Sequence, residues 1–118
     1  MSYLLVFLGG GLGAAARHGV NVATARAAAW PVGTLTVNVV GSLLMGALVG
    51  WLARRGASAE WRLFAATGVL GGFTTFSAFS LDVVLLWERA AAGAVLYAAA
   101  TLVLTLSGVF AGLWLVRP

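Results

Sequence analysis

"GVLGGFTTFSAFS", residues 68–80, places polar groups and flexible backbone in an apolar setting. The segment around it, residues 63–81, has no charged residue and is close to the roughly 20 residues that a helix needs to cross a bilayer. Its centre holds Gly71 and Gly72, followed by two threonines and two serines among three phenylalanines. Irregular backbone at bilayer depth persists only where it is buried in protein or lines a polar cavity. The stretch therefore predicts a membrane helix that is broken at the glycine pair.

The composition of the whole chain is typical of an integral membrane protein. Of its 118 residues, 62% are hydrophobic and 8% are charged, whereas soluble domains average about 45–50% and 25%. Two further charge-free segments, residues 27–53 and 90–116, exceed the roughly 20 residues of a crossing helix. A shorter apolar segment, residues 1–16, reaches that length if its helix continues past Arg17. We expect a single all-α membrane domain, residues 1–118, with four transmembrane helices and short links.

Charge and cysteine content narrow the classes of function. The net charge of +4 comes from arginines near helix ends, which is typical of interfacial anchoring rather than of a nucleic-acid partner. The acidic residues Glu60, Asp82 and Glu88 are expected at or outside helix ends, so no carboxylate is predicted in the membrane for proton coupling. The chain has no cysteine, and the lone His18 is assigned no chemistry. We expect no enzymatic activity, because no nucleophile–base pair or metal-ligating cluster stands out. The N-terminus lacks the basic leading region of a signal peptide, so it is taken as the first membrane helix.

The distribution of arginines hardly favours one orientation of the chain in the membrane over the other. Four spans place both termini and the middle connection on one side of the membrane. That side has Arg54, Arg55, Arg62 and Arg117, and the opposite side has Arg17, Arg26 and Arg89. Because orientation follows the excess of Lys and Arg, so small a difference is compatible with insertion in both directions. Dual insertion would permit an antiparallel homodimer, while an ordinary protein with weak charge bias is the alternative.

Small and polar residues recur at helical spacing in three of the expected helices. Gly9 and Gly13 in the first helix, and Gly46 and Gly50 in the second, predict close helix packing. Asn38 lies inside the second helix, where an amide is costly unless it is hydrogen-bonded. It is interpreted either as a helix–helix hydrogen bond or as a donor that lines a polar path. The fourth helix carries a further polar face, made of Tyr97, Thr101 and Thr105.

The residues that follow the glycine pair suit ions. Thr74 and Ser77 are three apart, as are Phe73, Phe76 and Phe79, so hydroxyls and rings form adjacent stripes. Ring edges carry positive charge, and beside hydroxyl donors they suit a small anion, although plain packing is the alternative. If two copies insert in opposite directions, the same residues meet only at the bilayer centre. Carbonyls freed at the break would converge there as ligands for a hard cation.

Three motifs together resemble the Fluc (CrcB-type) fluoride channel family. "GGFTTFSAFS" matches its signature, in which the third helix breaks at G-G-x-T-T-F-S-x-F. "GGGLGAAARH" places Arg17 at the motif's arginine, and "GTLTVNVVGSLLMG" places Asn38 at its asparagine. The resemblance covers three of the four expected helices, and the fourth is less motif-like.

The resemblance implies a dual-topology antiparallel homodimer in the bacterial inner (plasma) membrane, with two pores for passive export of cytoplasmic fluoride. It implies a central structural sodium ion held by the backbone carbonyls of Gly71 and Thr74. The implied pore residues are Asn38, Phe76, Phe79 and Ser77. Thr75 is a further candidate lining residue, and so are Tyr97, Thr101 and Thr105, which are inferred from their shared helix face rather than from the motif. Arg17 matches the motif's arginine without an assigned role.

Two other classes of small membrane protein are compatible with the same composition. A small multidrug-type exporter is another short four-helix protein that inserts both ways, but it relies on a membrane-embedded glutamate in its first helix, and this chain has none there. A non-transporting membrane assembly subunit would use its polar residues only to pack helices. Fluoride flux and sodium binding distinguish the channel from both.

Overall fold

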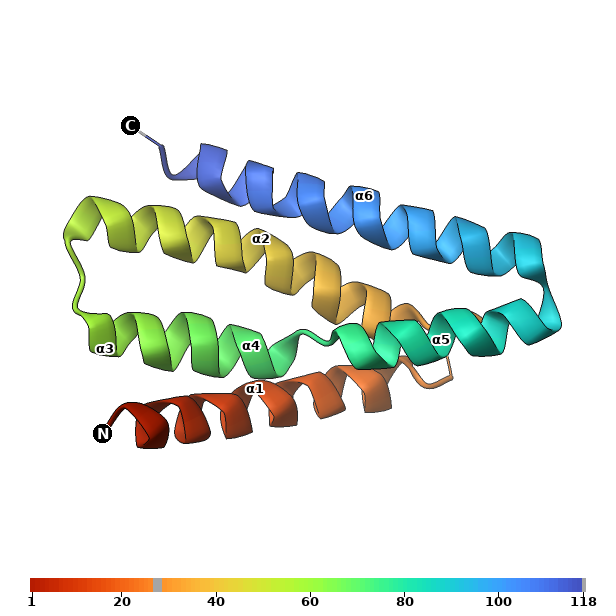
Figure 1. The fold of residues 1–118 in the computed structure, drawn as a ribbon, viewed down its shortest axis with the longest axis horizontal. Helices are drawn as coiled ribbons and strands as arrows, with labels where there is room; N and C mark the ends of the chain where they lie inside the picture. Colours follow the sequence, from red (N-terminus) through yellow and green to blue (C-terminus); the bar gives the residue numbers. More distant parts are fainter. Residues whose placement is uncertain (27–28, 118) are drawn as a thin grey trace.

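The computed structural model describes residues 1–26 and 29–117, which are almost entirely helical and contain no strand (Figure 1). Residues 27 and 28, with which one predicted membrane segment begins, lie outside the described part. The elements are α1 (Ser2–Thr24), α2 (Val32–Arg55), α3 (Ala59–Trp61), the π-helix η1 (Arg62–Leu70), α4 (Gly71–Phe73), α5 (Phe76–Arg89) and α6 (Ala91–Leu115).

Elements α3, η1, α4 and α5 follow one another along a single rod, so the described chain forms four long helical segments. These segments run alternately in opposite directions, and both chain ends lie at the same end of the bundle as the α2–α3 turn (Figure 1). The expected placement of the termini and the middle connection is confirmed. The long segments pack in pairs, α1 against η1 and α4, and α2 against α6.

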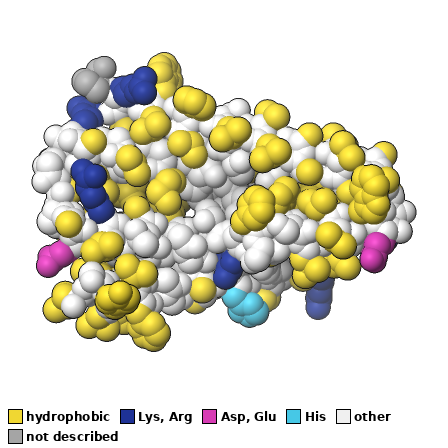
Figure 2. Space-filling view, viewed as in Figure 1, with side chains coloured by type: hydrophobic (Ala, Val, Ile, Leu, Met, Phe, Trp, Pro, Cys, Tyr) yellow, Lys and Arg dark blue, Asp and Glu magenta, His cyan; other side chains and the backbone are white. Residues whose placement is uncertain are grey.

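Three of the four segments are long and apolar enough to cross a membrane. They are Val32–Arg55, Ala59–Arg89 and Ala91–Leu115, with mean hydropathies of 1.8, 1.7 and 2.0. Helix α1 has 23 residues and continues past Arg17 as expected, but it is not among these three. Hydrophobic side chains cover the visible long faces of the molecule, and acidic side chains appear only near its ends (Figure 2). The chain thus has the surface of a multi-pass membrane protein.

Tryptophans mark the two ends of the bundle. All five are exposed, and each lies close to a helix end: Trp30, Trp51, Trp61, Trp87 and Trp114. Tryptophan is enriched at membrane–water interfaces, where its ring sits at the level of the lipid headgroups. The guanidinium of Arg55 lies 5.8 Å from the ring centroid of Trp51, so charge and aromatic ring share one interface.

Glycines allow the paired helices to approach through their backbones. A Cβ on Gly13 of α1 would meet the backbone of Val69 in η1, and one on Gly112 of α6 would lie 2.6 Å from the amide nitrogen of Ala47 in α2. Gly46 is restricted in the same way from the α2 side. Larger residues at these positions would force the helices apart, which confirms the prediction of close packing.

The break in the third long segment begins at Thr74, two residues after Gly72, so the prediction of a break at the glycine pair itself was wrong. Gly71 is helical, with φ −62° and ψ −38°. The extended residues are Thr74 (φ −87°, ψ 157°) and Thr75 (φ −153°, ψ 121°). Gly72 serves a different purpose, because a Cβ there would lie 3.0 Å from the Cα of Gly10 in α1. Its lack of a side chain permits close packing and does not loosen the helix.

Candidate functional site

The side chain of Asn38 holds the break from the neighbouring helix α2. Its Nδ2 donates to the carbonyl oxygen of Thr75 at 3.0 Å, and its Oδ1 accepts from the Thr75 amide at 2.8 Å. Asn38 is buried, so these bonds form away from solvent. The first of the two interpretations, an interhelical hydrogen bond, is therefore confirmed for Asn38. The same side chain also lines a hollow, described below.

The carbonyl groups at the break, those of Gly71 and Thr74 among them, lose the donors that an α-helix would supply. In a continuous helix, the Thr75 amide would bond the carbonyl of Gly71, and the Ala78 amide would bond that of Thr74. Instead, the Thr75 amide donates to Asn38, and the Ala78 amide donates to Oγ1 of Thr75 at 3.2 Å. These are the two carbonyls predicted to hold sodium. Their oxygen chemistry fits a hard cation.

The break also presents the ends of two helices to one another. The preceding helical run ends at Phe73 and α5 begins at Phe76, so a negative C-terminal end and a positive N-terminal end lie on either side of Thr74 and Thr75. The first amides of α5 have no partner within the helix. Carbonyl oxygens and amide hydrogens are thus offered within a few residues of each other, which suits ions of both signs.

A hollow of about 220 Å³ lies beside the break, between α2, α5 and α6. We call it the Thr101 hollow. Its lining residues are Asn38, Ser42, Thr74, Thr75, Phe76, Phe79, Thr101, Leu102 and Thr105. Every predicted pore residue except Ser77 and Tyr97 belongs to this set. Residues from three helices that are far apart in the sequence therefore meet at one site.

The hydroxyl of Thr101 has no hydrogen-bond partner among the described residues, although its residue is only 5% exposed. Thr105, one turn further along α6, differs because its Oγ1 donates to the Thr101 carbonyl at 2.7 Å. Buried polar groups are nearly always satisfied, and an unsatisfied one costs about 1–3 kcal/mol. The Thr101 hydroxyl is thus a donor without an assigned acceptor, on a residue that lines the hollow.

Two phenylalanine rings form one wall of the Thr101 hollow. The ring centroids of Phe76 and Phe79 are 5.4 Å apart, with planes tilted by 57°. Phe79 is 8% exposed, whereas Phe76 is 75% exposed. The pair thus runs from the interior of the helical bundle to its surface.

Tyr97 is fully buried and lines neither this hollow nor the one described next. Its hydroxyl donates to the carboxylate of Asp82 at 3.2 Å. The expectation that Asp82 lies at or outside a helix end was wrong, because α5 continues to Arg89. The charge-free segment ends at Leu81, but helix α5 continues beyond it. The helix can contain the Asp82 carboxylate because the Tyr97 hydroxyl donates a hydrogen bond to it. Asp82 lies within the membrane-capable segment.

A second and more open hollow, of about 500 Å³, lies on the α1 side of the break. We call it the Arg17 hollow. Its lining residues are Ala14, Arg17, His18, Asn21, Thr75, Ser77, Ala78 and Leu81. Thr75 lines both hollows, and its Oγ1 lies 3.3 Å from the Oγ of Ser77. The motif arginine, which had no assigned role, thus shares a hollow with a predicted pore residue.

Three polar lining residues of the two hollows, Ser42, His18 and Asn21, were not among the predicted site residues. Ser42 lies one helical turn from Asn38, a spacing that could have placed it on the same face of α2. His18 and Asn21 follow Arg17 on α1, but their presence beside α5 could not be read from a single helix. The sequence does not say which helix lies opposite them.

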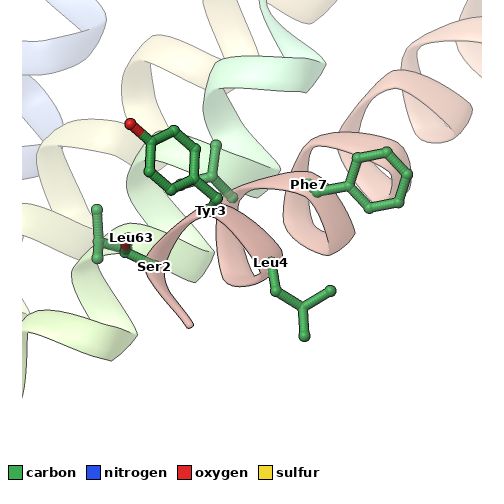
Figure 3. A pocket seen from close by; sticks show the side chains of 6 residues that line it. Ser2, Tyr3, Leu4, Phe7 and Leu63 are labelled. Atoms are coloured by element: carbon green, nitrogen blue, oxygen red, sulfur yellow. The ribbon is translucent and has the colours of Figure 1, made fainter.

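A further hollow lies far from the break, at the start of α1 (Figure 3). It measures about 830 Å³, and its lining is almost wholly apolar. Tyr3 and Leu63 lie on one side of the view, and Leu4 and Phe7 on the other (Figure 3). It offers no titratable cluster, so it is not a candidate for ion chemistry.

Residues 4–113 match the family described as CrcB-like protein, Camphor Resistance (CrcB). The chain is 60% identical over 121 residues to a protein of Nitrobacter hamburgensis named "Fluoride-specific ion channel FluC 2", with 99% of this chain and 98% of the relative covered.

Two other relatives, both named "Fluoride-specific ion channel FluC", match over similar lengths. One, from Rhodopseudomonas palustris, is 54% identical, with 99% of this chain and 98% of the relative covered. The other, from Methylobacterium nodulans, is 52% identical, with 99% and 97% covered. The similarity therefore extends over all four long segments and both hollows.

Proposed function

The chain belongs to the CrcB family, and we propose that it is a passive, fluoride-selective ion channel that exports fluoride across the bacterial plasma membrane. The observation that carries this proposal is the Thr101 hollow, whose lining combines Asn38, a threonine with an unpartnered buried hydroxyl, and a pair of phenylalanine rings. The names of relatives that match over nearly their whole length point to the same ion.

In this proposal α1 is a fourth transmembrane helix. Its 23 residues are long enough for about 30 Å of hydrocarbon at 1.5 Å per residue. Arg17 does not prevent insertion in this proposal, because it shares a hollow with the polar side chains of Asn21, Thr75 and Ser77. With α1 included, both termini lie on the same side of the membrane.

The functional unit is proposed to be an antiparallel homodimer. The near balance of arginines at the two ends favours insertion in both directions. Phe76 is exposed, although its neighbour Phe79 is buried. We take the exposed ring of Phe76 as part of the surface that a second copy covers. In such a dimer each copy would complete a hollow of the other, which gives two pathways per dimer.

Sodium is proposed as the ion at the centre of this dimer. The carbonyl oxygens of Gly71 and Thr74, released from their helical donors, would hold it together with the same groups of the second copy. When bound, the cation neutralises oxygens that would otherwise repel one another. Replacing sodium with choline is expected to lower the thermal unfolding midpoint of the dimer, and a midpoint that ignores sodium would reject this ion.

Selection of fluoride is proposed to rest on donors that replace its water. Asn38 uses one N–H on the Thr75 carbonyl, which leaves its second N–H free to donate. The Thr101 hydroxyl adds a donor, and the edges of Phe76 and Phe79 add partial positive charge. Chloride is larger and accepts hydrogen bonds more weakly, so a narrow site of this kind disfavours it.

The other side of the break supplies an entrance. Arg17, Ser77 and Thr75 line the Arg17 hollow, where a guanidinium attracts anions and hydroxyls can donate to them. Because Thr75 also lines the Thr101 hollow, an anion leaving one hollow can be passed to the other at this residue. Tyr97 is proposed to shape this route indirectly, by packing against Phe79 with a 5.5 Å centroid separation.

The carboxylate of Asp82 does not make the channel proton-coupled in this proposal. It accepts a hydrogen bond from Tyr97 and lies outside the lining of both hollows. A multidrug-type exporter would need an acidic residue in the first helix, and α1 has none from Ser2 to Thr24. Fluoride would then follow its electrochemical gradient, which favours anion exit by about 2.3 kcal/mol per charge for each 100 mV of inside-negative potential.

The direct test is efflux of fluoride from reconstituted liposomes, followed with a fluoride electrode. Fluoride is expected to leave rapidly and chloride to remain, while protein-free liposomes retain both. Retention of fluoride would favour a non-transporting assembly subunit. Proton-dependent efflux of a cationic drug without fluoride flux would favour the exporter.

A further inference from the structure

His18 and Arg17 are the titratable side chains that line the Arg17 hollow. Arg17 is half-buried and His18 is exposed, and both occur on α1 directly opposite the first turns of α5. Figure 2 shows dark blue and cyan basic side chains next to each other on one edge of the molecule. His18 lies about 24 Å along α1 from Ser2 at 1.5 Å per residue, well past the level of the break. An imidazole at such depth in a membrane helix is expected to face water or protein rather than lipid.

Arg26 follows the end of α1, eight residues after His18, and keeps its positive charge at any pH of interest. The charged groups on the elements packed against α1 are distant. The elements packed against α1 are η1, α4 and α2, and their charged side chains are Arg62, Arg54 and Arg55, all at the opposite end of the bundle.

On α5, whose first turns line the hollow, Asp82 accepts from Tyr97 outside the lining, and Glu88 and Arg89 lie at the far end of the helix. The lining residues from α5 itself, Ser77, Ala78 and Leu81, do not titrate. No carboxylate among the described lining residues therefore offsets a charge on His18.

We propose that His18 makes anion entry depend on pH: when protonated, it adds a second positive charge beside Arg17 and draws fluoride toward Thr75 and Ser77. This role rests on the proposed function, in which the Arg17 hollow is an entrance to the pathway. Histidine ordinarily changes charge between about pH 8 and pH 5, whereas arginine stays charged throughout.

The size of the effect follows from Coulomb's law. A unit charge about 6–8 Å from an anion in a water-filled mouth raises the local concentration of that anion about two- to threefold. The increase is screened by salt over about 10 Å at 0.1 M ionic strength, so it is largest in dilute solution. Because the charge acts on entry, it lowers the fluoride concentration that gives half-maximal current and leaves the saturating current unchanged.

The test is the electrical current carried by fluoride through the full-length protein in planar lipid bilayers, because the uncharged acid contributes no current. Wild-type current in dilute fluoride is expected to rise about two- to threefold from about pH 8 to about pH 6. The current of His18→Gln should equal the lower wild-type current, that at about pH 8, at both pH values. The current of His18→Arg should equal the higher wild-type current, that at about pH 6, at both. Ala23→His on the His18→Gln background adds an imidazole outside the hollow lining and should not restore the response.

The outcomes separate the two proposals. Wild-type current that ignores pH, or a response that survives in His18→Gln, would overturn the role of His18 while leaving the channel intact. At about 1 M salt, charges are screened within about 3 Å. A pH response of the fluoride current that persists undiminished at this salt concentration would also overturn the role of His18. Absence of fluoride current at every pH would reject the proposed function, and the role of His18 with it.

Discussion

The side chain of Asn38 bonds both the amide and the carbonyl of Thr75, at 2.8 and 3.0 Å, across 37 residues of sequence. The Asn38 side chain thus supplies the hydrogen bonds that a neighbouring backbone segment would otherwise supply. It does so at the point where the third long segment stops being helical. One amide from α2 satisfies both backbone groups of an extended residue at membrane depth, where an unsatisfied group costs several kcal/mol.

Asn38→Ala is expected to abolish most fluoride flux and to lower the thermal unfolding midpoint. It leaves the buried amide and carbonyl of Thr75 without partners, at about 1–3 kcal/mol each. Liposome efflux and unfolding in detergent measure the two effects. Val40→Ala, on the lipid-exposed side of the same helix, should change neither. Normal flux in Asn38→Ala would mean that the break does not depend on this side chain.

Phe76→Ile and Phe79→Ile are each expected to stop flux with the dimer still assembled, because isoleucine has no positive ring edge. Their stabilities should differ. Phe79 is buried against Tyr97, so its replacement should cost about 1–2 kcal/mol, whereas the exposed Phe76 should cost little in an isolated subunit. Phe110→Ile, at an exposed ring of α6, is the matched control. Undiminished efflux from either variant would reject a role for that ring.

Thr101→Val is expected to reduce flux while leaving the free energy of unfolding unchanged or raised by about 1 kcal/mol. Valine keeps the shape of threonine and removes a buried hydroxyl that has no protein partner. Thr105→Val removes a hydroxyl bonded to the helix backbone, so it should affect flux less. Fluoride efflux and unfolding curves, measured for both variants and for the wild type, test these expectations. A clear loss of stability in Thr101→Val would indicate that its hydroxyl serves packing instead.

Asp82→Asn is expected to retain flux within about threefold of wild type, because its side-chain carbonyl still accepts from the Tyr97 hydroxyl. Asp82→Leu should lower the unfolding midpoint, since it leaves a buried tyrosine hydroxyl unsatisfied at about 1–3 kcal/mol. Fluoride efflux recorded together with internal pH tests whether protons are coupled. Loss of transport in Asp82→Asn, with proton movement in wild type, would contradict passive flow.

Much of the helical arrangement could be predicted because membrane helices are recognised from length and composition. The predicted segment 90–116 matches α6 almost to the residue, and the continuation of α1 past Arg17 followed from the length a crossing helix needs. The end of α5 was missed because a charge was read as a boundary. Asp82 remains inside the helix because Tyr97, from another helix, supplies a donor.

The break was misplaced for a related reason. Glycine signals either a loosened backbone or a close approach, and only the position of α1 over Gly72 distinguishes the two. The hollow lining could be anticipated where its residues share one helix face, as Thr101 and Thr105 do, although their role in conduction stays a prediction. That His18 shares a hollow with residues of α5 could not be anticipated, because no periodicity within α1 reveals which helix lies beside it.

Thr75 is part of the wall of both hollows. It therefore acts as a partition between two chambers, and any substitution there alters both chambers at once. Independent adjustment of entry and exit must fall to residues that border a single chamber, such as Ser42 on one side and Asn21 on the other. Variation among natural homologues should accordingly be tolerated at those outer positions and restricted at the shared threonine.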